Sequence, residues 1–320
     1  MWVAYYAGGE RFIVRVMLTG GAGYIGTELV YRLSAEPGIS DILVYDNLCK
    51  GNYNLFTGLR KVPGNKVRFV QADILDSRSL RQSMQGMDVV FHLAAKVETP
   101  FADQNAHDFE QTNHWGTAEL VYAAEALKLP RLIYLSSQQV YGQGEVTSPD
   151  HLRVPDSFYA ISKMRGEAHV LRLMQKLPVQ LVRCANLYGY SKNLRFESHI
   201  NQLIFDAHFS NRISIHGDPD HILSYISLYR TVEVLAQLAL VDRPSASYNL
   251  SHRQLSTRDV VDALREFYPG LETISVDQHI PLRNLTMQCD ARLAVLLPAD
   301  TTLREDIAKF RQLFTFNPGQ

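Results

Sequence analysis

A glycine-rich turn near the start of the chain constrains the fold more than any other feature of the sequence. An apolar run at residues 14–18 is followed by Gly20, Gly21, Gly23 and Gly26, and a helical pattern begins within the turn. Three of these glycines fit the spacing GxGxxG, and Gly20 adds a further position with an unrestricted backbone. Such a turn lets a pyrophosphate approach the backbone, and the helix start presents free N–H groups to it. We therefore expect a strand–turn–helix unit that binds a dinucleotide.

The first half of the chain alternates short apolar runs with longer helical patterns. The expected strands are residues 14–18, 42–45, 67–71, 89–92, 132–135 and 180–183, and the expected helices are residues 25–34, 79–84, 108–127 and 159–177. Runs that are apolar at successive positions suit strands covered on both faces. We therefore predict an α/β fold with a doubly wound parallel sheet, joined by right-handed crossovers.

The regular alternation of strands and helices ends after Arg183, which indicates a second, smaller lobe. The expected helices there are residues 198–210, 231–240, 256–267 and about 302–313, and the expected strands are residues 213–216 and 248–250. Ser256 with Asp259 matches a capping box, and Thr301 or Thr302 can cap the last helix. We expect residues 1–183 to form the dinucleotide-binding domain, including an N-terminal extension. Residues 184–320 form mainly an α/β substrate-binding lobe, from which about 213–250 return to the first domain.

Composition excludes several other classes of protein. A formal net charge of −1 over 320 residues gives no electrostatic reason to expect nucleic acid or an anionic membrane as a partner. No apolar run approaches the about 20 residues that span a bilayer, and the opening segment lacks the basic region of a signal peptide. Cys49, Cys184 and Cys289 lie far apart without a CxxC pair, which argues against a zinc site or a disulfide framework. We therefore expect a cytoplasmic protein without a metal site, whose partner is a small molecule.

An acidic residue follows the second expected strand. Asp46 lies 20 positions after Gly26. A carboxylate at this place accepts hydrogen bonds from ribose hydroxyls and would repel a 2′-phosphate. It therefore indicates NAD rather than NADP.

Three side chains suggest proton chemistry beside that cofactor. Tyr159 and Lys163 lie four positions apart, on one face of an expected helix. The ammonium can lower the pKa of the phenol and hold the nicotinamide ribose, so that Tyr159 exchanges a proton with a substrate hydroxyl or carbonyl. Ser137 follows an expected strand at the sheet edge where such folds bind ligands, and it can hydrogen-bond the reacting oxygen. We predict these three residues as the catalytic set.

Together these motifs resemble the extended short-chain dehydrogenase/reductase superfamily, in its NAD-dependent epimerase/dehydratase branch. The resemblance runs from Val14 to the last helix and rests on TGGAGYIG, DNL, DI, HLAA, the serine before VYG, YAISK and RCANLYG. It implies a Rossmann domain whose NAD site contains Gly20, Gly23, Tyr24, Ile25, Gly26, Asp46, Asn47, Leu48, Asp73, Ile74, Leu93, Ala94, Ala95, Lys96, Asn113, Tyr159 and Lys163.

The resemblance also implies roles for parts of this set. Asp73 and Ile74 should flank the adenine, residues 94–96 should line the nicotinamide side, and Asn113 should support the site from behind. The substrate should contact Ser137, Gln138 and Asn186. The helices that contain Asn113 and Tyr159 resemble those of a four-helix dimer interface, so the family resemblance implies a homodimer.

The residues after Ser137 bear on the reaction. Nucleotide-sugar 4,6-dehydratases of the family carry an Asp–Glu pair here, and the decarboxylases carry a Glu at the second position, whereas this chain has Gln138 and Gln139. An amide cannot shuttle a proton as a carboxyl group does. Dehydration is therefore disfavoured, which leaves epimerisation by transient oxidation, or net reduction of a ketone. The segment DNLCKGN resembles UDP-galactose 4-epimerases, which favours epimerisation of a sugar, with a nucleotide sugar as the expected substrate.

Two departures from the family pattern argue against a nucleotide on the substrate. Leu223 and Leu296 stand where arginines for the substrate diphosphate are expected, and leucine cannot supply charge-assisted contacts. Arg195, Arg212 or Arg292 are the alternative cations, and Tyr190 replaces the proline expected after Gly189. Two further hypotheses therefore stay open: a reductase or dehydrogenase of a sugar, polyol or hydroxyketone without a nucleotide, and a non-catalytic NAD-binding scaffold.

Overall fold

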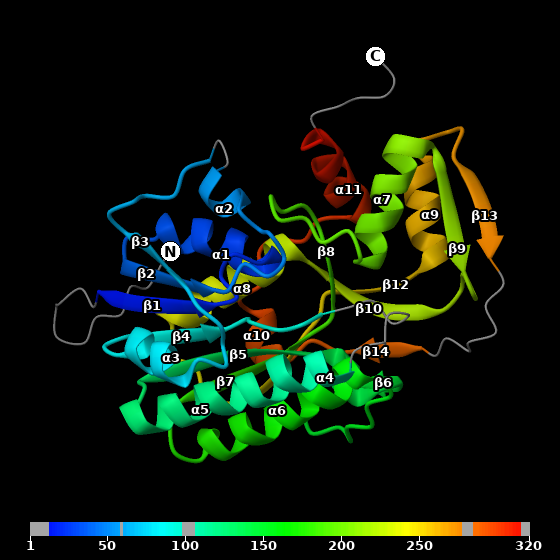
Figure 1. Ribbon diagram of the computed structural model, residues 1–320. Helices are drawn as coiled ribbons and strands as arrows, with labels where there is room; N and C mark the ends of the chain where they lie inside the picture. Colours follow the sequence, from blue (N-terminus) through cyan, green and yellow to red (C-terminus); the bar gives the residue numbers. More distant parts are fainter. Residues whose placement is uncertain (1–12, 58–59, 98–105, 277–283, 315–320) are drawn as a thin grey trace.

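A parallel sheet of seven strands forms the centre of the molecule (Figure 1). The computed structural model describes residues 13–57, 60–97, 106–276 and 284–314, so most of the expected N-terminal extension lies outside the described residues. The strand order is β11 (Ala246–Leu250), β7 (Val179–Cys184), β5 (Arg131–Ser137), β4 (Val89–His92), β1 (Val14–Thr19), β2 (Ile39–Asp46) and β3 (Val67–Gln71). Every neighbouring pair is parallel, which confirms the predicted doubly wound Rossmann sheet.

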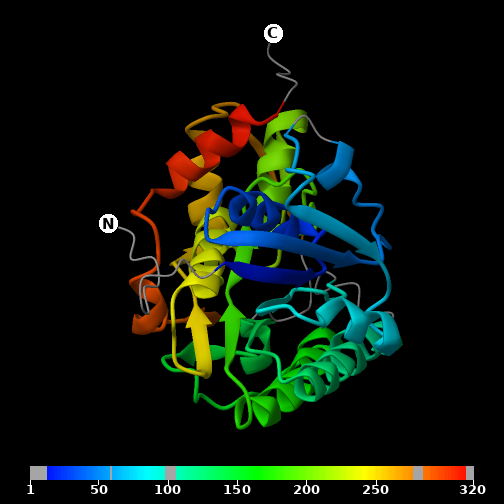
Figure 2. The same cartoon turned by 90° about the vertical axis from the view of Figure 1, so that its left-hand side faces the viewer.

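Helices cover both faces of this sheet (Figures 1 and 2). One face carries α3 (Ser77–Met84), α5 (Gly116–Leu127) and α6 (Phe158–Met174), and the other carries α1 (Tyr24–Ser34) and α8 (Leu228–Leu240). Strand β1 shows why its sequence is apolar at successive positions. Met17 is buried in the core on the side of α5, whereas Val16 and Leu18 are buried in the core on the side of α1.

The expected helix at residues 108–127 is three consecutive pieces. The short helix α4 (Ala106–Phe109) leads into a π-helical segment, Glu110–Trp115, and α5 follows. The π-helical segment contains the buried Asn113, whose Oδ1 accepts from Lys96 N at 2.8 Å. Its Nδ2 donates to Lys96 O and to Ser162 Oγ, each at 3.0 Å. These long-range hydrogen bonds favour a widened turn that helical periodicity alone does not predict.

A second cluster beside the sheet comes mainly from the later part of the chain, together with β6 (Gly144–Val146), while α8 and β11 return to the main sheet (Figure 1). A second sheet there has the strand order β12 (Arg253–Ser256), β10 (Ile222–Ser227), β14 (Leu285–Met287) and β6. Strand β8 (Asn186–Tyr188) also pairs with β10. A third, small sheet consists of β13 (Glu272–Val276) and β9 (Arg212–His216). The remaining helices are α2 (Asn54–Thr57), the 3-10 turn Gln138–Tyr141, α7 (His199–Ser210), α9 (Thr257–Arg265), α10 (Ala291–Ala294) and α11 (Leu303–Gln312). A capping box starts α9 at Ser256, as predicted, and another starts α11 at Thr302, one of the two threonines that the sequence offered as a cap. Among the described residues, no helix is long and apolar enough to cross a membrane.

Candidate functional site

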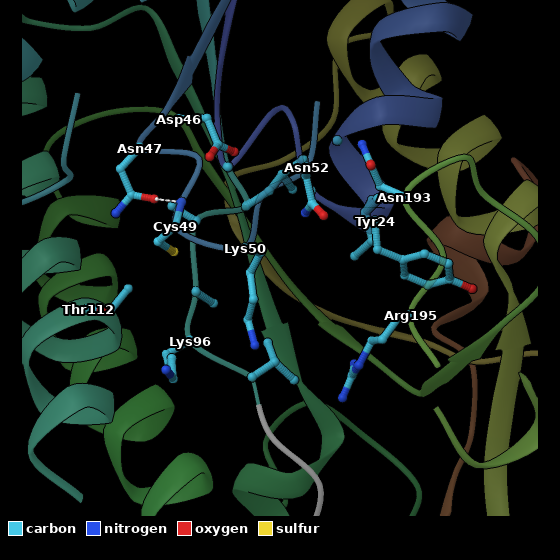
Figure 3. Close-up of a pocket in the computed structure, with 18 of the residues that line it drawn as sticks. Tyr24, Asp46, Asn47, Cys49, Lys50, Asn52, Lys96, Thr112, Asn193 and Arg195 are labelled. Atoms are coloured by element: carbon cyan, nitrogen blue, oxygen red, sulfur yellow. Dashed lines mark hydrogen bonds between the residues drawn. The ribbon is translucent and has the colours of Figure 1, made fainter. Parts of the chain in front are cut away.

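A cavity of about 370 Å³ lies at the carboxyl ends of the first four strands of the chain (Figure 3). It brings together most of the predicted cofactor residues: Gly20, Gly23, Tyr24, Ile25, Gly26, Asp46, Asn47, Ile74, Leu93, Ala94, Ala95 and Lys96. The predicted residues Leu48, Asp73, Asn113, Tyr159 and Lys163 do not line it, nor do Ser137, Gln138 and Asn186. Their places are described below, except for Asn113, whose contacts are given above.

The glycine-rich loop is packed too tightly for side chains at two positions. A Cβ on Gly20, which has a φ of +69°, would lie 2.6 Å from Ala94 N, and a Cβ on Gly26 would lie 2.5 Å from Gly20 O. No side chain caps the start of α1, so N–H groups of its first turn can bind a phosphate. The loop therefore fits the pyrophosphate of a dinucleotide.

Asp46 is held at the end of β2 by backbone groups. Its Oδ2 accepts from Ala22 N at 3.0 Å, and its Oδ1 accepts from Leu48 N at 2.8 Å. Burial raises the pKa of this carboxyl group, and the two hydrogen bonds partly lower it. Asn47 donates to Asp73 Oδ2 at 2.8 Å, so Asp73 supports the loop after β2 rather than the cavity wall. The arrangement suits a carboxylate that accepts from ribose hydroxyls.

Tyr159 lies in the first turn of α6, whose N-cap Ser157 accepts from Ala160 N. Burial raises the pKa of the Tyr159 phenol, while the Arg195 guanidinium and a hydrogen bond with Ser137 lower it. The sequence argument attributed the lowering of this pKa to Lys163. In the structure Arg195 and Ser137 lower it, and the Lys163 ammonium donates to Leu135 O in β5. An effect of Lys163 on Tyr159 stays a prediction.

Lys163 is buried against β5. Its Nζ donates to Leu135 O at 2.8 Å and lies 4.4 Å from the centre of the Tyr134 ring. Burial lowers the pKa of Lys163 to about 8, and the nearby Glu167 carboxylate opposes this. A lysine with this pKa is still mostly charged at neutral pH, and because burial disfavours that charge, an acceptor offered by a bound cofactor would stabilise it.

The predicted substrate residues occupy three different environments. Ser137 ends β5, and its Oγ accepts from Gln139 N at 3.2 Å. Gln138 is fully buried, and its Nε2 donates to Ser224 O at 3.2 Å while its Oε1 is buried without a partner. Asn186 lies in β8, which pairs with β10. Only Ser137 therefore has an interaction with Tyr159 in this set.

Apart from Arg195, which the sequence offered as an alternative cation, the residues of a second wall of the cavity were not predicted. This wall comes from the segment between β8 and α7 and from the loop after β2, and it includes Leu187, Asn193, Leu194, Arg195, Phe196, Glu197, Cys49, Lys50 and Asn52. Figure 3 shows Lys50 and Arg195 pointing into the cavity, with Lys96 nearby. The altered motif after Gly189, where Tyr190 replaces proline, was the available signal that this segment runs differently.

The three candidate arginines have different surroundings. Arg195 lines the cavity, whereas Arg212 pairs with Glu272 at 2.8 Å and Arg292 pairs with Asp290 at 2.6 Å. Leu296 is buried in the core, and Leu223 lies in β10 beside Leu255 and Leu285. Neither leucine lines the cavity, so Arg195 is the candidate arginine that reaches it.

Several known proteins are similar to this chain in sequence or in fold. A dTDP-glucose 4,6-dehydratase of Streptomyces griseus is 30% identical over 265 residues, which cover 78% of this chain and 77% of that protein. The structure of MoeE5 in complex with UDP-glucose and NAD is 27% identical, with a TM-score of 0.77, and the match covers 93% of this chain and 97% of that one. UDP-glucuronic acid 4-epimerase from Bacillus cereus, in complex with UDP-glucuronic acid and NAD, has a TM-score of 0.82 at 21% identity, covering 94% of this chain and all of that one. The sequence model of the NAD dependent epimerase/dehydratase family matches residues 16–240, and this chain therefore belongs to that NAD-dependent family of extended short-chain dehydrogenase/reductases.

Proposed function

We propose that this chain is a nucleotide-sugar epimerase, which oxidises a sugar hydroxyl to a ketone and reduces it again from the opposite face. The observation that carries the proposal is the amide pair Gln138–Gln139 directly after Ser137. The dehydratases that the chain resembles use carboxyl groups at these positions to move the protons that elimination of water requires. Gln138 is held by its hydrogen bond to Ser224 O and has no ionisable proton to give.

The catalytic groups suit one proton transfer at one oxygen. Tyr159 removes the hydroxyl proton of the sugar while Ser137 hydrogen-bonds the same oxygen, and the Arg195 charge stabilises the phenolate form. When bound, NAD accepts the hydride from the sugar carbon and returns it. Tyr159 then gives its proton back to the oxygen, so that neither protons nor electrons are consumed overall.

The charge of the cavity wall supports an anionic substrate. Arg195 and Lys50 point into the cavity, and Lys96 lies beside them with Asp108 at 3.6 Å from its ammonium. NAD phosphates would use part of this charge, since the same cavity contains the predicted cofactor residues. Arg195 also acts on Tyr159, so its charge is available to a phosphate group that a nucleotide sugar carries and a simple polyol lacks. MoeE5 was solved with UDP-glucose, and the B. cereus epimerase with UDP-glucuronic acid. We therefore propose that the substrate is a nucleoside diphosphate sugar.

Product analysis in D₂O tests the reaction. UDP-glucose, dTDP-glucose and UDP-glucuronic acid are incubated separately with the enzyme, and the sugars are followed by proton NMR. Epimerisation gives a C4 epimer without deuterium at C5 and without net change in NADH absorbance. A 4-keto-6-deoxy sugar labelled at C5 would show dehydration, and stoichiometric NADH oxidation would show net reduction; either result contradicts the proposal.

Two matched variants check the roles of the residues. Tyr159→Phe should lower turnover by about 10²–10⁴-fold, the usual contribution of a general acid–base group, without weakening NAD binding. Arg195→Met should raise KM for a nucleotide sugar, whereas the ion-paired surface residue Arg212→Met should not. Equal effects of the two arginine substitutions would remove the support for the anionic substrate. Wild-type turnover in Tyr159→Phe would remove the proposed acid–base role.

We further propose that the protein is a cytoplasmic homodimer, in which residues 1–183 bind NAD and residues 184–320 mainly bind the substrate. The outer surface of α5 and of the π-helical segment carries the exposed side chains of Trp115 and Tyr122. Aromatic side chains are enriched in the centres of protein interfaces, and a second copy would bury these two. Light scattering should give twice the chain mass, and Tyr122→Glu should give the monomer.

A further inference from the structure

The segment between β8 and α7 is tied to the glycine-rich loop by side chains, and we name residues 189–195 the clasp segment. Tyr24 donates its hydroxyl proton to Gly189 O at 2.6 Å. Asn193 Nδ2 donates to Ala22 O and to Thr27 Oγ1, each at 2.8 Å. The glycine-rich loop that would carry the cofactor phosphates is thus joined directly to the segment that forms the opposite wall of the cavity.

The hydrogen bonds of Asn193 are buried, and the side chains of Asn193 and Arg195 point in different directions. Asn193 is 5% exposed, and its amide points toward the start of α1, whereas Arg195 reaches into the cavity (Figure 3). Asn201 holds both ends of the clasp segment, because its Oδ1 accepts from Gly189 N at 2.8 Å and its Nδ2 donates to Arg195 O at 3.0 Å. Asn193 Oδ1 is also buried and has no hydrogen-bond partner among the described residues, so the hydrogen bonds of Nδ2 are what fix this amide in place.

We propose that Asn193 is a positioning residue that fastens the clasp segment to the glycine-rich loop. Through this tie it retains the bound dinucleotide and keeps Arg195 beside Tyr159. Residues on both sides of the tie line the same cavity, so a dinucleotide bound along the glycine-rich loop is released when the clasp segment moves away. The effect on Tyr159 follows because Arg195 lowers the pKa of the phenol from within the clasp segment.

Retention has a chemical purpose if the chain is an epimerase, and that purpose alone rests on the proposed function. An enzyme that oxidises and then reduces the same sugar must keep NADH until the ketone has been reduced. Net oxidoreductases instead exchange the cofactor in each cycle. The release rate itself is a property of the binary complex and is measured without substrate.

Stopped-flow fluorescence tests the tie. The full-length protein loaded with NADH is mixed with excess NAD, and the loss of NADH fluorescence gives the release rate. Asn193→Ala removes both hydrogen bonds to the glycine-rich loop and should accelerate release by about tenfold or more. The matched control is Asn54→Ala, which removes the exposed hydrogen bond of Asn54 to Lys192 O at 2.8 Å and should change release less than twofold. Release from Asn193→Ala at the wild-type rate, or equal acceleration by Asn54→Ala, overturns the proposal.

A second variant and a second readout separate positioning from general destabilisation. Tyr24→Phe removes the hydroxyl that donates to Gly189 O and accepts from Asn201 Nδ2 at 3.3 Å, and it should accelerate release severalfold, whether or not Asn193→Ala folds. In Asn193→Ala the apparent pKa assigned to Tyr159 in the pH profile of kcat/KM should rise, since Arg195 no longer stays beside it. Wild-type release in Tyr24→Phe, or an unchanged profile in Asn193→Ala, contradicts the tie. If the products instead refute epimerisation, the release measurements still decide the role of Asn193.

Discussion

Glu167→Gln should destabilise the fold and change the titration of Lys163. Glu167 lies fully buried in α6, where its Oε1 accepts from Arg183 Nε at 2.9 Å and its Oε2 accepts from Arg183 Nη2 at 2.8 Å. Arg153 Nη1 donates to the same carboxylate at 2.9 Å. Glutamine keeps the shape but leaves the buried Arg183 charge without a counter-charge. Breaking a buried pair from one side costs about 3–5 kcal/mol.

The same substitution acts on Lys163. Burial lowers the pKa of Lys163 to about 8, and the Glu167 charge raises it. Without that charge the pKa should fall further, so the ammonium is lost at lower pH than in the wild type. Since the folded-state pKa lies below the unfolded value, Lys163 lowers stability at acidic and neutral pH, and this cost disappears as pH rises from about 8 through the unfolded pKa. The alkaline limb of the activity profile should therefore move toward neutral pH in Glu167→Gln.

Urea unfolding and calorimetry measure the first effect. A loss of about 3–5 kcal/mol in a chain of this length lowers Tm by roughly 5–8 °C. The control is Arg165→Gln on the same helix, which breaks the more exposed pair with Glu110 at 2.7 Å and should cost about 1 kcal/mol or less. The buried-pair reasoning is refuted if Glu167→Gln loses no more stability than Arg165→Gln.

Three further variants test other parts of the site. His92 should stay neutral in NMR titrations down to about pH 4, since burial lowers its pKa to about 3. Stability should therefore fall as pH drops from about 6.5, by up to about 1.4 kcal/mol per pH unit, and His92→Gln should abolish this part of the slope. Gly20→Ala should lower stability and NAD affinity, measured by calorimetry, because its Cβ would lie 2.6 Å from a backbone nitrogen; wild-type affinity would contradict this packing. Gln138→Asp combined with Gln139→Glu should produce a 4-keto-6-deoxy sugar from dTDP-glucose in the NMR assay, and its absence would show that carboxyl groups there are insufficient.

The central sheet could be predicted because its signals are local. Each strand of the first half is a short apolar run, and the turn at Gly20–Gly26 needs only its own glycines to be recognised. The same holds for the capping boxes at Ser256 and Thr302, where both partners lie three residues apart. Strands such as β8 and β14 escaped prediction since three residues carry too little pattern, and pairing with distant strands determines them.

The π-helical segment and the clasp segment depend on contacts between residues far apart in sequence. Asn113 bonds Lys96 and Ser162, and Asn193 bonds Ala22, so neither conformation follows from its own neighbours along the chain. Side-chain amides can donate and accept in many geometries, which gives a single sequence no means of choosing among them. The role of Lys163 in the acidity of Tyr159 stays a prediction, because spacing along a helix does not determine which way an ammonium turns, and here Nζ donates to Leu135 O.

The position of Arg195 supplies a cation for the proposed nucleotide substrate without the expected motif. Leu223 and Leu296 led to the hypothesis of a substrate without a nucleotide, on the assumption that the phosphate-binding cations keep their places in the chain. Leu296 belongs to the core and lines no part of the cavity, so its identity has no bearing on charge there. The electrostatic field in a cavity depends on where charges end up in space, and the clasp segment brings Arg195 into the same cavity from a different element. If Arg195→Met leaves KM for nucleotide sugars unchanged, Leu223 and Leu296 again argue against a nucleotide on the substrate. A sugar, polyol or hydroxyketone without a nucleotide then becomes the better hypothesis.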